Sequence, residues 1–407
     1  MGLSDLDRLI EPSRVRNYAL MLLAGYLLLI VVLALAAEGG LDPAGKPLGA
    51  DFIAFYSAAD LALQGRAAEA YDFAALFAAH ERAVPGTQHL FAWYYPPPFQ
   101  LIVAPLARLP YLAALGLWVG VGLGLFLALV RRLTDHPWAP LLALAFPATL
   151  LNVLHGQNGF LNAALLGFGL LLLDRRPWVA GALLGLLVYK PHLGVLLPLL
   201  LAAQGRWRSF AAAAASALGL CAASWAMLGP EVWAAFLDNF GKLGAVIDGK
   251  LLPQAKIPTL FVAARELGAP SGLAYALHGG LALALAGLTV LAWRRPGPQR
   301  LKVALAVPAI LSVSPYAFDY DLVLLAIPIA LLAEHARRDE LPAGAKAALV
   351  LAYFTPVAFS GLAQLTHVQL MPLGVLALYA AAWASLRRAA AAQAPLRSGN
   401  RVEQAPA

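Results

Sequence analysis

The sequence predicts an all-α polytopic membrane protein, and three observations support this prediction. Of the 407 residues, 61% are hydrophobic and only 13% are charged, and the mean hydropathy is +0.72. A soluble domain could not bury so much apolar surface in one core. Apolar runs of membrane-spanning length recur along the chain, and Lys and Arg concentrate in short segments between alternate runs. We expect a bundle of about 10 to 13 transmembrane helices with surface helices in the first outer loop.

The first apolar run covers residues 18–37 and contains no charged residue. At 1.5 Å per residue it is long enough to cross a hydrocarbon core of about 30 Å. Arg8, Arg14 and Arg16 precede it in the short segment 1–17. We interpret the run as an uncleaved signal anchor that follows a cytoplasmic N-terminus.

Further apolar runs predict the remaining spans of a single transmembrane domain, residues 18–388. The stretch 178–203 is predicted to split into two short helices at Lys190, because a lysine at the bilayer centre costs about 2.5–3.5 kcal/mol. With this split, most of the 29 basic residues fall in cytoplasmic segments, including the tail 389–407, which is predicted to be disordered. The other predicted spans are 111–130, 137–153, 159–173, 209–228, 270–293, 301–315, 320–333, 343–359 and 369–386.

The first outer loop, residues 38–98, is predicted to contain two helices. Apolar residues recur at helical spacing over 52–63, and Gly65 can end that helix. Asp72 can cap a second helix that runs to about Arg82. Residues 99–107 follow a proline run and are too short to span, so we expect a helix that dips into the outer leaflet. A strongly tilted crossing is the alternative.

This threading places every polar cluster on the non-cytoplasmic side, where two kinds of charge are candidates for chemistry. Asp51, at the membrane boundary, suits a general base for a hydroxyl group, or it caps the helix 52–63. Lys190 could hold a lipid phosphate, or its side chain could extend to the interface. Lys256 and Arg265 could add positive charge, or they are solvated loop residues.

Polar and aromatic side chains beside these charges are candidates for sugar or acceptor binding. Amides and carboxylates can bond sugar hydroxyls, but the same residues also occur in turns and at helix starts. A tyrosine can stack on a sugar, or it can belong to an interfacial aromatic belt. These candidates are His155, Gln157, Asn158, Tyr95, His192, Asp319 and Asp321.

Several other functional classes lack their sequence marks. The chain has no GxxxxGK[ST] loop, no HExxH motif, no GxSxG elbow and no Rossmann glycine pattern. Cys221 is the only cysteine, so no disulfide and no cysteine-based metal site is expected. Nucleic-acid binding is not expected either, because the net charge of +7 is explained by basic cytoplasmic loops.

Taken together, five segments in order resemble glycosyltransferase family 87. They are D51FIAFYSAADLALQGRAAEAYD72, Y95PPPFQLIVAPLARLP110, G156QNGFLNAALLGFGLLLL173, A180GALLGLLVYKP191 and S314PYAFDYDLVLL325. The resemblance implies a bacterial inner-membrane enzyme of the GT-C fold with an extracytoplasmic active site. It also implies Asp51 as the base and a polyprenyl-phosphate sugar, often mannose, as the donor. Many relatives carry a Trp-His pair in the late motif, where this chain has Ala317 to Asp321, so the sugar and the acceptor stay open.

We therefore expect a hexosyltransferase that transfers a sugar to a glycan or glycolipid acceptor with inversion of configuration. Asp51 would take the proton of the acceptor hydroxyl. Lys190, aided by Arg265, Lys256 or a divalent cation, would hold the departing phosphate. No other cofactor is expected, and both termini are expected in the cytoplasm. The alternatives are a flippase for lipid-linked sugars, which would show an inverted repeat, and an envelope polymer ligase, which would carry a long late loop rich in Arg and His.

Overall fold

The computed structural model describes residues 11–248 and 253–392. Within these ranges the chain forms helices joined by short connections, and it contains no β-strand. The predicted all-α architecture is confirmed. The first ten residues and residues 393–407, which hold most of the predicted tail, lie outside the described part. The last helix, α20 (Met371–Ala392), continues past the start of that predicted tail.

Five helices in the described part are long and apolar enough to cross a membrane. They correspond to the predicted spans 18–37, 111–130, 209–228, 270–293 and 343–359. The polytopic prediction is therefore confirmed. The five are α2 (Pro12–Ala36), α6 (Tyr111–Leu133), α13 (Trp207–Leu228), α16 (Ser271–Arg294) and α19 (Ala345–Thr366).

The predicted span 369–386 corresponds to α20, and the other predicted spans are shorter helices, some of them interrupted. The interruption within 137–153 falls at Pro147, because the residue before a proline avoids the helical conformation. The span near 320–333 begins as a tight 3₁₀ segment before it becomes an α-helix. These elements are α7 (Ala139–Leu144), α8 (Pro147–His155), α9 (Gly159–Leu172), α17 (Gln299–Val313), η5 (Asp319–Leu325) and α18 (Ala326–His335).

The chain reverses direction at Lys190, as the charge distribution predicted. Lys190 contacts Asp321 at one end of the bundle. At the opposite end, Arg206, which follows the second half, pairs with Asp174, which precedes the first half. The two halves are therefore antiparallel. They comprise α10 (Pro177–Gly185) and η3 (Leu186–Tyr189), then α11 (Pro191–Gly194) and α12 (Leu197–Ala203).

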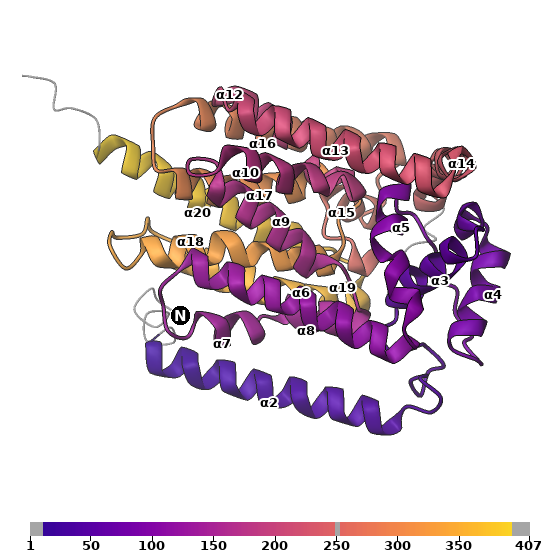
Figure 1. The fold of residues 1–407 in the computed structure, drawn as a ribbon. Helices are drawn as coiled ribbons and strands as arrows, with labels where there is room; N and C mark the ends of the chain where they lie inside the picture. The colour runs from indigo at the N-terminus through magenta and orange to yellow at the C-terminus, as the bar shows by residue number, and fades with distance from the viewer. Residues whose placement is uncertain (1–10, 249–252, 393–407) are drawn as a thin grey trace, which may run out of the picture.

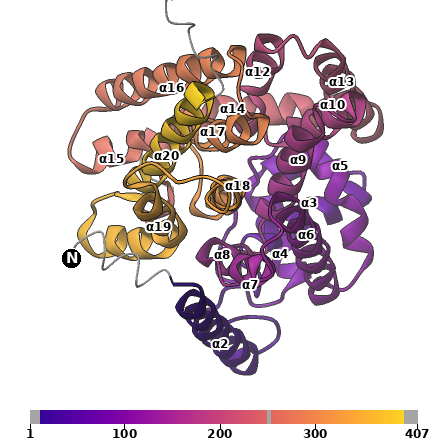
Figure 2. The ribbon, with the colours of Figure 1, turned by 90° about the vertical axis from the view of Figure 1, so that its left-hand side faces the viewer.

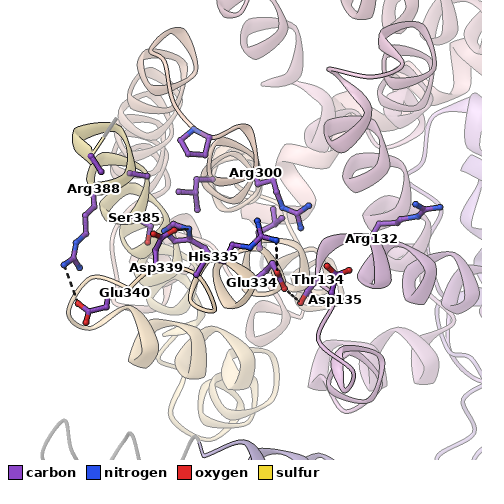
Figure 3. Close-up of a pocket in the computed structure, with 16 residues that line it drawn as sticks. Arg132, Thr134, Asp135, Arg300, Glu334, His335, Asp339, Glu340, Ser385 and Arg388 are labelled. Carbon is purple, nitrogen blue, oxygen red and sulfur yellow. Dashed lines mark hydrogen bonds and ion pairs between the residues drawn. The ribbon is translucent and has the colours of Figure 1, made fainter. Parts of the chain in front are cut away.

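The helices run lengthwise through the molecule, so the bundle has two distinct ends (Figures 1 and 2). We call one the Asp51 end, where Asp51, Gln157 and Lys190 lie. We call the other the arginine end, where Arg132 of α6 and Arg300 of α17 line one pocket (Figure 3). The segments predicted to be cytoplasmic begin or end there. The side of the membrane that each end faces stays a prediction.

The segment between α2 and α6 folds over the Asp51 end (Figure 1). Gly65 has a φ of +74° just after the first helix, and the Asp72 carboxylate accepts a hydrogen bond from the backbone N–H of Ala75 at 2.8 Å. Both predicted helix boundaries are confirmed. Trp93 and Phe99 stack beneath the first helix, with ring centroids 5.6 Å apart. The elements are α3 (Phe52–Leu63), η1 (Ala67–Tyr71), α4 (Phe73–Ala83), α5 (Pro97–Val103) and η2 (Ala104–Arg108).

A second connection, between α13 and α16, also lies at the Asp51 end. Asn239 of its first helix donates a hydrogen bond to the backbone carbonyl of Trp93 at 3.2 Å. Thr259 caps the last helix of this connection, because its side-chain hydroxyl accepts a hydrogen bond from the backbone N–H of Val262. This connection therefore packs against the first one. Its elements are α14 (Pro230–Asp248), η4 (Gln254–Lys256) and α15 (Leu260–Glu266).

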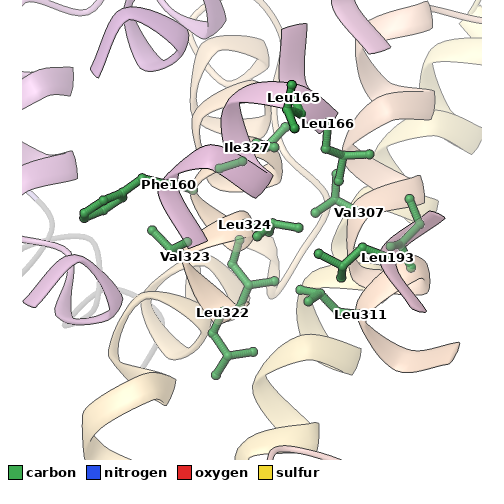
Figure 4. Packing of buried hydrophobic residues seen from close by; sticks show 14 of the residues in the cluster. Phe160, Leu165, Leu166, Leu193, Val307, Leu311, Leu322, Val323, Leu324 and Ile327 are labelled. Carbon is green, nitrogen blue, oxygen red and sulfur yellow. The ribbon is translucent and has the colours of Figure 1, made fainter. Parts of the chain in front are cut away.

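Close packing of apolar residues and glycines holds the bundle together. Phe160 of α9, Val307 of α17 and Val323 of η5 belong to one buried cluster (Figure 4). In α10, a Cβ at Gly181 or Gly185 would lie 2.2 Å from a backbone carbonyl of α13. This G-x-x-x-G pair lets the two helix backbones touch, which is how helices associate in a membrane by van der Waals contact.

Candidate functional site

Six chain segments that are distant in sequence meet at the Asp51 end. Hydrogen bonds or ion pairs connect the predicted site residues across separations of up to 131 positions. Two parts can be distinguished by exposure: a partly exposed rim with Asp51, His155 and Lys256, and a buried floor with Lys190 and Asp321. The segments are 49–51, 93–95, 155–158, 189–192, 254–256 and 319–321.

Asp51 does not act as the cap of α3. Its side chain makes no capping hydrogen bond, although the residue directly precedes the helix. The carboxylate oxygen Oδ2 instead accepts a hydrogen bond of 2.9 Å from the amide nitrogen of Gln157. The preceding Gly49 and Ala50 have φ values of +80° and +34°, so a turn in the left-handed region directs this residue. Asp51 is half-buried and remains reachable from outside.

A glycine allows the segment 155–158 to approach Asp51. Gly156 has a φ of +56°, a conformation that side chains with a Cβ rarely adopt. A Cβ at this position would also lie 2.6 Å from the Cβ of Phe52 and 3.1 Å from the carbonyl oxygen of Gly49. Conformation and space therefore both require glycine here, and Gln157 follows at once.

The orientation of the Gln157 amide is fixed by two donors. Its Oε1 accepts hydrogen bonds from the Tyr95 hydroxyl at 3.3 Å and from the backbone N–H of Asn158 at 3.2 Å. Burial raises the pKa of Tyr95, and the nearby charges of Asp321 and Asp51 raise it further, so the hydroxyl keeps its proton and can donate. The NH₂ group of Gln157 must then face Asp51.

Lys190 is buried on the floor of the site and already has a counter-charge. It is 3% exposed, and its Nζ lies 2.6 Å from Oδ1 of Asp321, which is 0% exposed. The ammonium also donates to Oδ1 of Asn158 at 3.0 Å and lies 4.9 Å from the ring centroid of Tyr320. His192 Nε2 lies 3.8 Å from the second oxygen of Asp321. We call Lys190 and Asp321 the buried pair.

Lys256 lies on the rim and contacts a neutral partner. Its Nζ is 2.9 Å from Nε2 of His155. The Nδ1 atom of that ring lies 2.9 Å from the carbonyl of Leu151, to which it donates, so Nε2 is left as an acceptor for the ammonium. Within the described part of the chain, no carboxylate lies within ion-pair distance of Lys256. Lys256 is therefore an accessible positive charge of the site.

Two predicted site residues remain, Asp319 and Arg265. Asp319 is buried; one of its oxygens accepts from the backbone N–H of Tyr320 at 2.8 Å, and it lies within the electrostatic influence of Lys256 and Asp51. Arg265 donates to the carbonyl of Ala269 at the end of α15. Among the described residues, no group of three His, Cys, Asp or Glu side chains could hold a metal ion.

Sequence reasoning missed three residues that support the floor. Asn162 donates to Oδ1 of Asn158 at 3.0 Å, and the Tyr189 hydroxyl donates to Oδ1 of Asn162. Asn152 donates to the carbonyl of Tyr320 at 2.8 Å. Asn162 could have been found from the sequence, because it lies four residues after the candidate Asn158 and therefore on the same face of an otherwise apolar helix.

Comparison with known proteins gives one result. No curated protein and no solved structure matches this chain. A family model, described as glycosyltransferase family 87, matches residues 93–315, which is more than half of the chain. The match includes Tyr95, Gln157, Lys190 and Lys256, whereas Asp51 lies before it and Asp319 and Asp321 lie after it. With this match added to the all-α membrane architecture, the chain belongs to glycosyltransferase family 87.

Proposed function

We propose that the chain is a membrane hexosyltransferase whose active site is the rim at the Asp51 end. The donor is a polyprenyl-phosphate sugar, with mannose as the first candidate, and the acceptor is a hydroxyl of a glycan or glycolipid. One observation carries the proposal: a reachable carboxylate, oriented by Gln157, shares a partly exposed rim with Lys256, which has no acidic partner among the residues that the structure describes. A base and an accessible cation are the two groups that this transfer needs.

The proposed reaction is a single in-line displacement. The acceptor oxygen attacks the anomeric carbon while Asp51 takes the hydroxyl proton. The bond between that carbon and the phosphate oxygen breaks, and the phosphate leaves with the electron pair. Configuration at the carbon inverts, because attack and departure occur on opposite faces. Because Oδ2 of Asp51 accepts a hydrogen bond from Gln157, Oδ1 is the oxygen that takes the proton of the acceptor hydroxyl.

The geometry favours Lys256 over Lys190 as the residue that holds the departing phosphate. Lys190 lies 2.6 Å from Asp321 and is almost inaccessible, so the charge of an incoming phosphate would compete with a carboxylate already in contact. Lys256 is partly exposed and bonds a neutral imidazole. The buried pair instead anchors the floor, where its ammonium also fixes Asn158 beside Gln157.

The proposal places the Asp51 end on the extracytoplasmic side of a bacterial inner membrane. The segments that hold most Lys and Arg residues lie toward the opposite end, and such segments normally stay in the cytoplasm. A lipid-linked donor fits this side, because its prenyl chain can stay in the bilayer while its phosphate reaches the boundary.

Membranes that contain the protein can be incubated with radiolabelled prenyl-phosphate sugars and an acceptor pool. Asp51→Asn should lower transfer by about 100-fold or more, which is the usual contribution of a general base. The matched control is Asp60→Asn, which removes a carboxylate of α3, the helix that follows Asp51; this carboxylate pairs with Arg82 at 3.0 Å. Transfer by Asp51→Asn at the wild-type rate would remove the base assignment. Label that crosses the membrane without being transferred would favour a flippase.

A further inference from the structure

A pocket of about 500 Å³ lies at the arginine end (Figure 3), which is the end of the bundle opposite the proposed active site. Its wall is formed by the last turn of α6, the first turn of α17, and the ends of α18 and α20. This volume is in the range of small-molecule sites. Neither the family match nor the proposed transfer assigns a role to this pocket.

The acidic side chains of the pocket are mostly engaged by internal partners. Glu334 accepts from the Thr134 hydroxyl at 2.8 Å and pairs with Arg337 at 3.1 Å and Arg338 at 3.6 Å. Asp339 lies 3.4 Å from Nδ1 of His335. Glu340 lies 3.8 Å from Arg388. Three of the four acidic residues that line the pocket therefore have partners within the chain.

Arg132 and Arg300 line the pocket without a carboxylate partner. Neither has an ion pair within 4 Å in the described part of the chain, and Asp135, which also lines this wall, is beyond that distance from both. Arg300 donates to the carbonyl of Leu133, the last residue of α6, which holds its guanidinium beside the helix end that carries Arg132. Two guanidinium groups without acidic partners among the described residues therefore line one pocket, at the ends of α6 and α17.

We propose that this pocket binds a phosphate group through Arg132 and Arg300. A planar guanidinium presents paired N–H donors that match phosphate oxygens, and Arg132 and Arg300 each bring such a group to the lining of the pocket. Both arginines lie where apolar helices end, which is the depth of lipid headgroups, and basic pockets between helix ends bind anionic headgroups. Leu301 and Leu331 add apolar surface to the same pocket. The phosphate can come from an anionic phospholipid or from a soluble compound.

Thermal unfolding of the purified full-length protein in detergent tests the proposal. Phosphatidylglycerol should raise the unfolding midpoint, whereas zwitterionic phosphatidylcholine should raise it less. If inorganic phosphate raises it as well, the site accepts a soluble phosphate; if only the lipid does, the source is the headgroup. A wild-type protein that responds to neither anion, or to both lipids equally, would overturn the proposal.

Two variants connect the response to this wall. Arg132→Gln removes a guanidinium that makes no hydrogen bond or ion pair within the described residues, so the variant should fold and respond less to phosphatidylglycerol. Arg132→Gln/Arg300→Gln should abolish the response. The control is Arg131→Gln, an exposed neighbour outside the pocket, which should respond as the wild type does. The proposal fails if the Arg132 variants keep the wild-type response or if the Arg131 variant loses it equally.

Discussion

At the residue scale, the neutral amide of Gln157 decides how Asp51 is presented. Its donor group contacts one carboxylate oxygen at 2.9 Å, while Tyr95 and the Asn158 backbone hold the other side of the amide. Replacing Gln157 by Glu keeps the shape but puts two carboxylates at hydrogen-bond distance. Such a pair binds a proton at higher pH than a single carboxylate does.

We expect Gln157→Glu to shift the rising limb of the rate against pH to higher pH, and Gln157→Leu to lower the turnover number by about 100-fold through loss of positioning. The measurement is sugar transfer between pH 5 and 9. Gln64→Glu, which adds the same charge at an exposed position after α3, should leave the profile unchanged. An unshifted profile in Gln157→Glu would show that the amide does not position the base.

The two lysines of the site should respond differently to removal. Lys190→Met leaves the Asp321 carboxylate buried without its partner, which typically costs about 3–5 kcal/mol, so the protein should be strongly destabilised. Lys190→Met/Asp321→Leu removes both charges and should recover much of the thermal stability. Lys256→Met should keep the unfolding midpoint and lower transfer. If the Lys190 and Lys256 variants show the same pattern of stability and transfer, the separation into floor and rim is wrong.

Sequence reasoning identified most of the individual site residues but not their partners. Asp51, Gln157, Lys190 and Lys256 stand out because polar residues are costly among apolar runs. The contact between Lys190 and Asp321 joins residues 131 positions apart, and it appears only once the helices are packed. From the sequence alone, Lys190 was the first candidate for the phosphate and Lys256 only an aid to it.

At the element scale, the distribution of basic residues predicted the chain reversal at Lys190. Glycines, in contrast, determine how closely α10 packs against α13. The split at Lys190 followed from keeping basic loops on one side, and the contacts of Arg206 with Asp174 confirm it. The break before Pro147 and the 3₁₀ start of the segment after Phe318 were not predicted, because hydropathy records neither local helix type nor a kink.

The contact between α10 and α13 gives a prediction at this scale. Gly185→Val places side-chain atoms where a Cβ already meets the Ala213 carbonyl at 2.2 Å, so α10 must move away from α13. We expect a loss of stability of about 1–3 kcal/mol or more and weaker transfer, because α10 leads through η3 to Lys190. Gly219→Val, on α13 with open space around it, is the matched control and should unfold at the wild-type temperature.

Helix α4 supplies a prediction about pH. Burial lowers the pKa of His80 from 6.5 to about 4, although a hydrogen bond to the Phe91 carbonyl acts in the opposite direction. The folded state therefore favours neutral histidine, so the stability it contributes is present above pH 6.5 and is lost as the pH falls from about 6.5 to 4. The full loss is on the order of 3 kcal/mol.

This loss can be isolated with His80→Asn, which cannot titrate in that range. The unfolding midpoint of the wild type should fall more steeply than that of the variant between pH 7 and pH 5, since all other titrating groups are common to both. Parallel curves would show that His80 titrates as a free histidine does.

At the scale of the whole molecule, the proposed chemistry depends on which side of the membrane each end faces. A prenyl-linked donor is proposed for the extracytoplasmic side, so the Asp51 end must face outward. In a Cys221→Ala background, Gln64→Cys marks the Asp51 end and Arg175→Cys marks the segment between α9 and α10 at the opposite end; both positions are exposed. A membrane-impermeant maleimide should label Gln64→Cys in cells with an intact inner membrane and Arg175→Cys only after permeabilisation. The reverse pattern would put Asp51 in the cytoplasm, where the soluble nucleotide sugars are available, and the proposal of a polyprenyl-phosphate donor would lose its support even if Asp51→Asn abolished transfer.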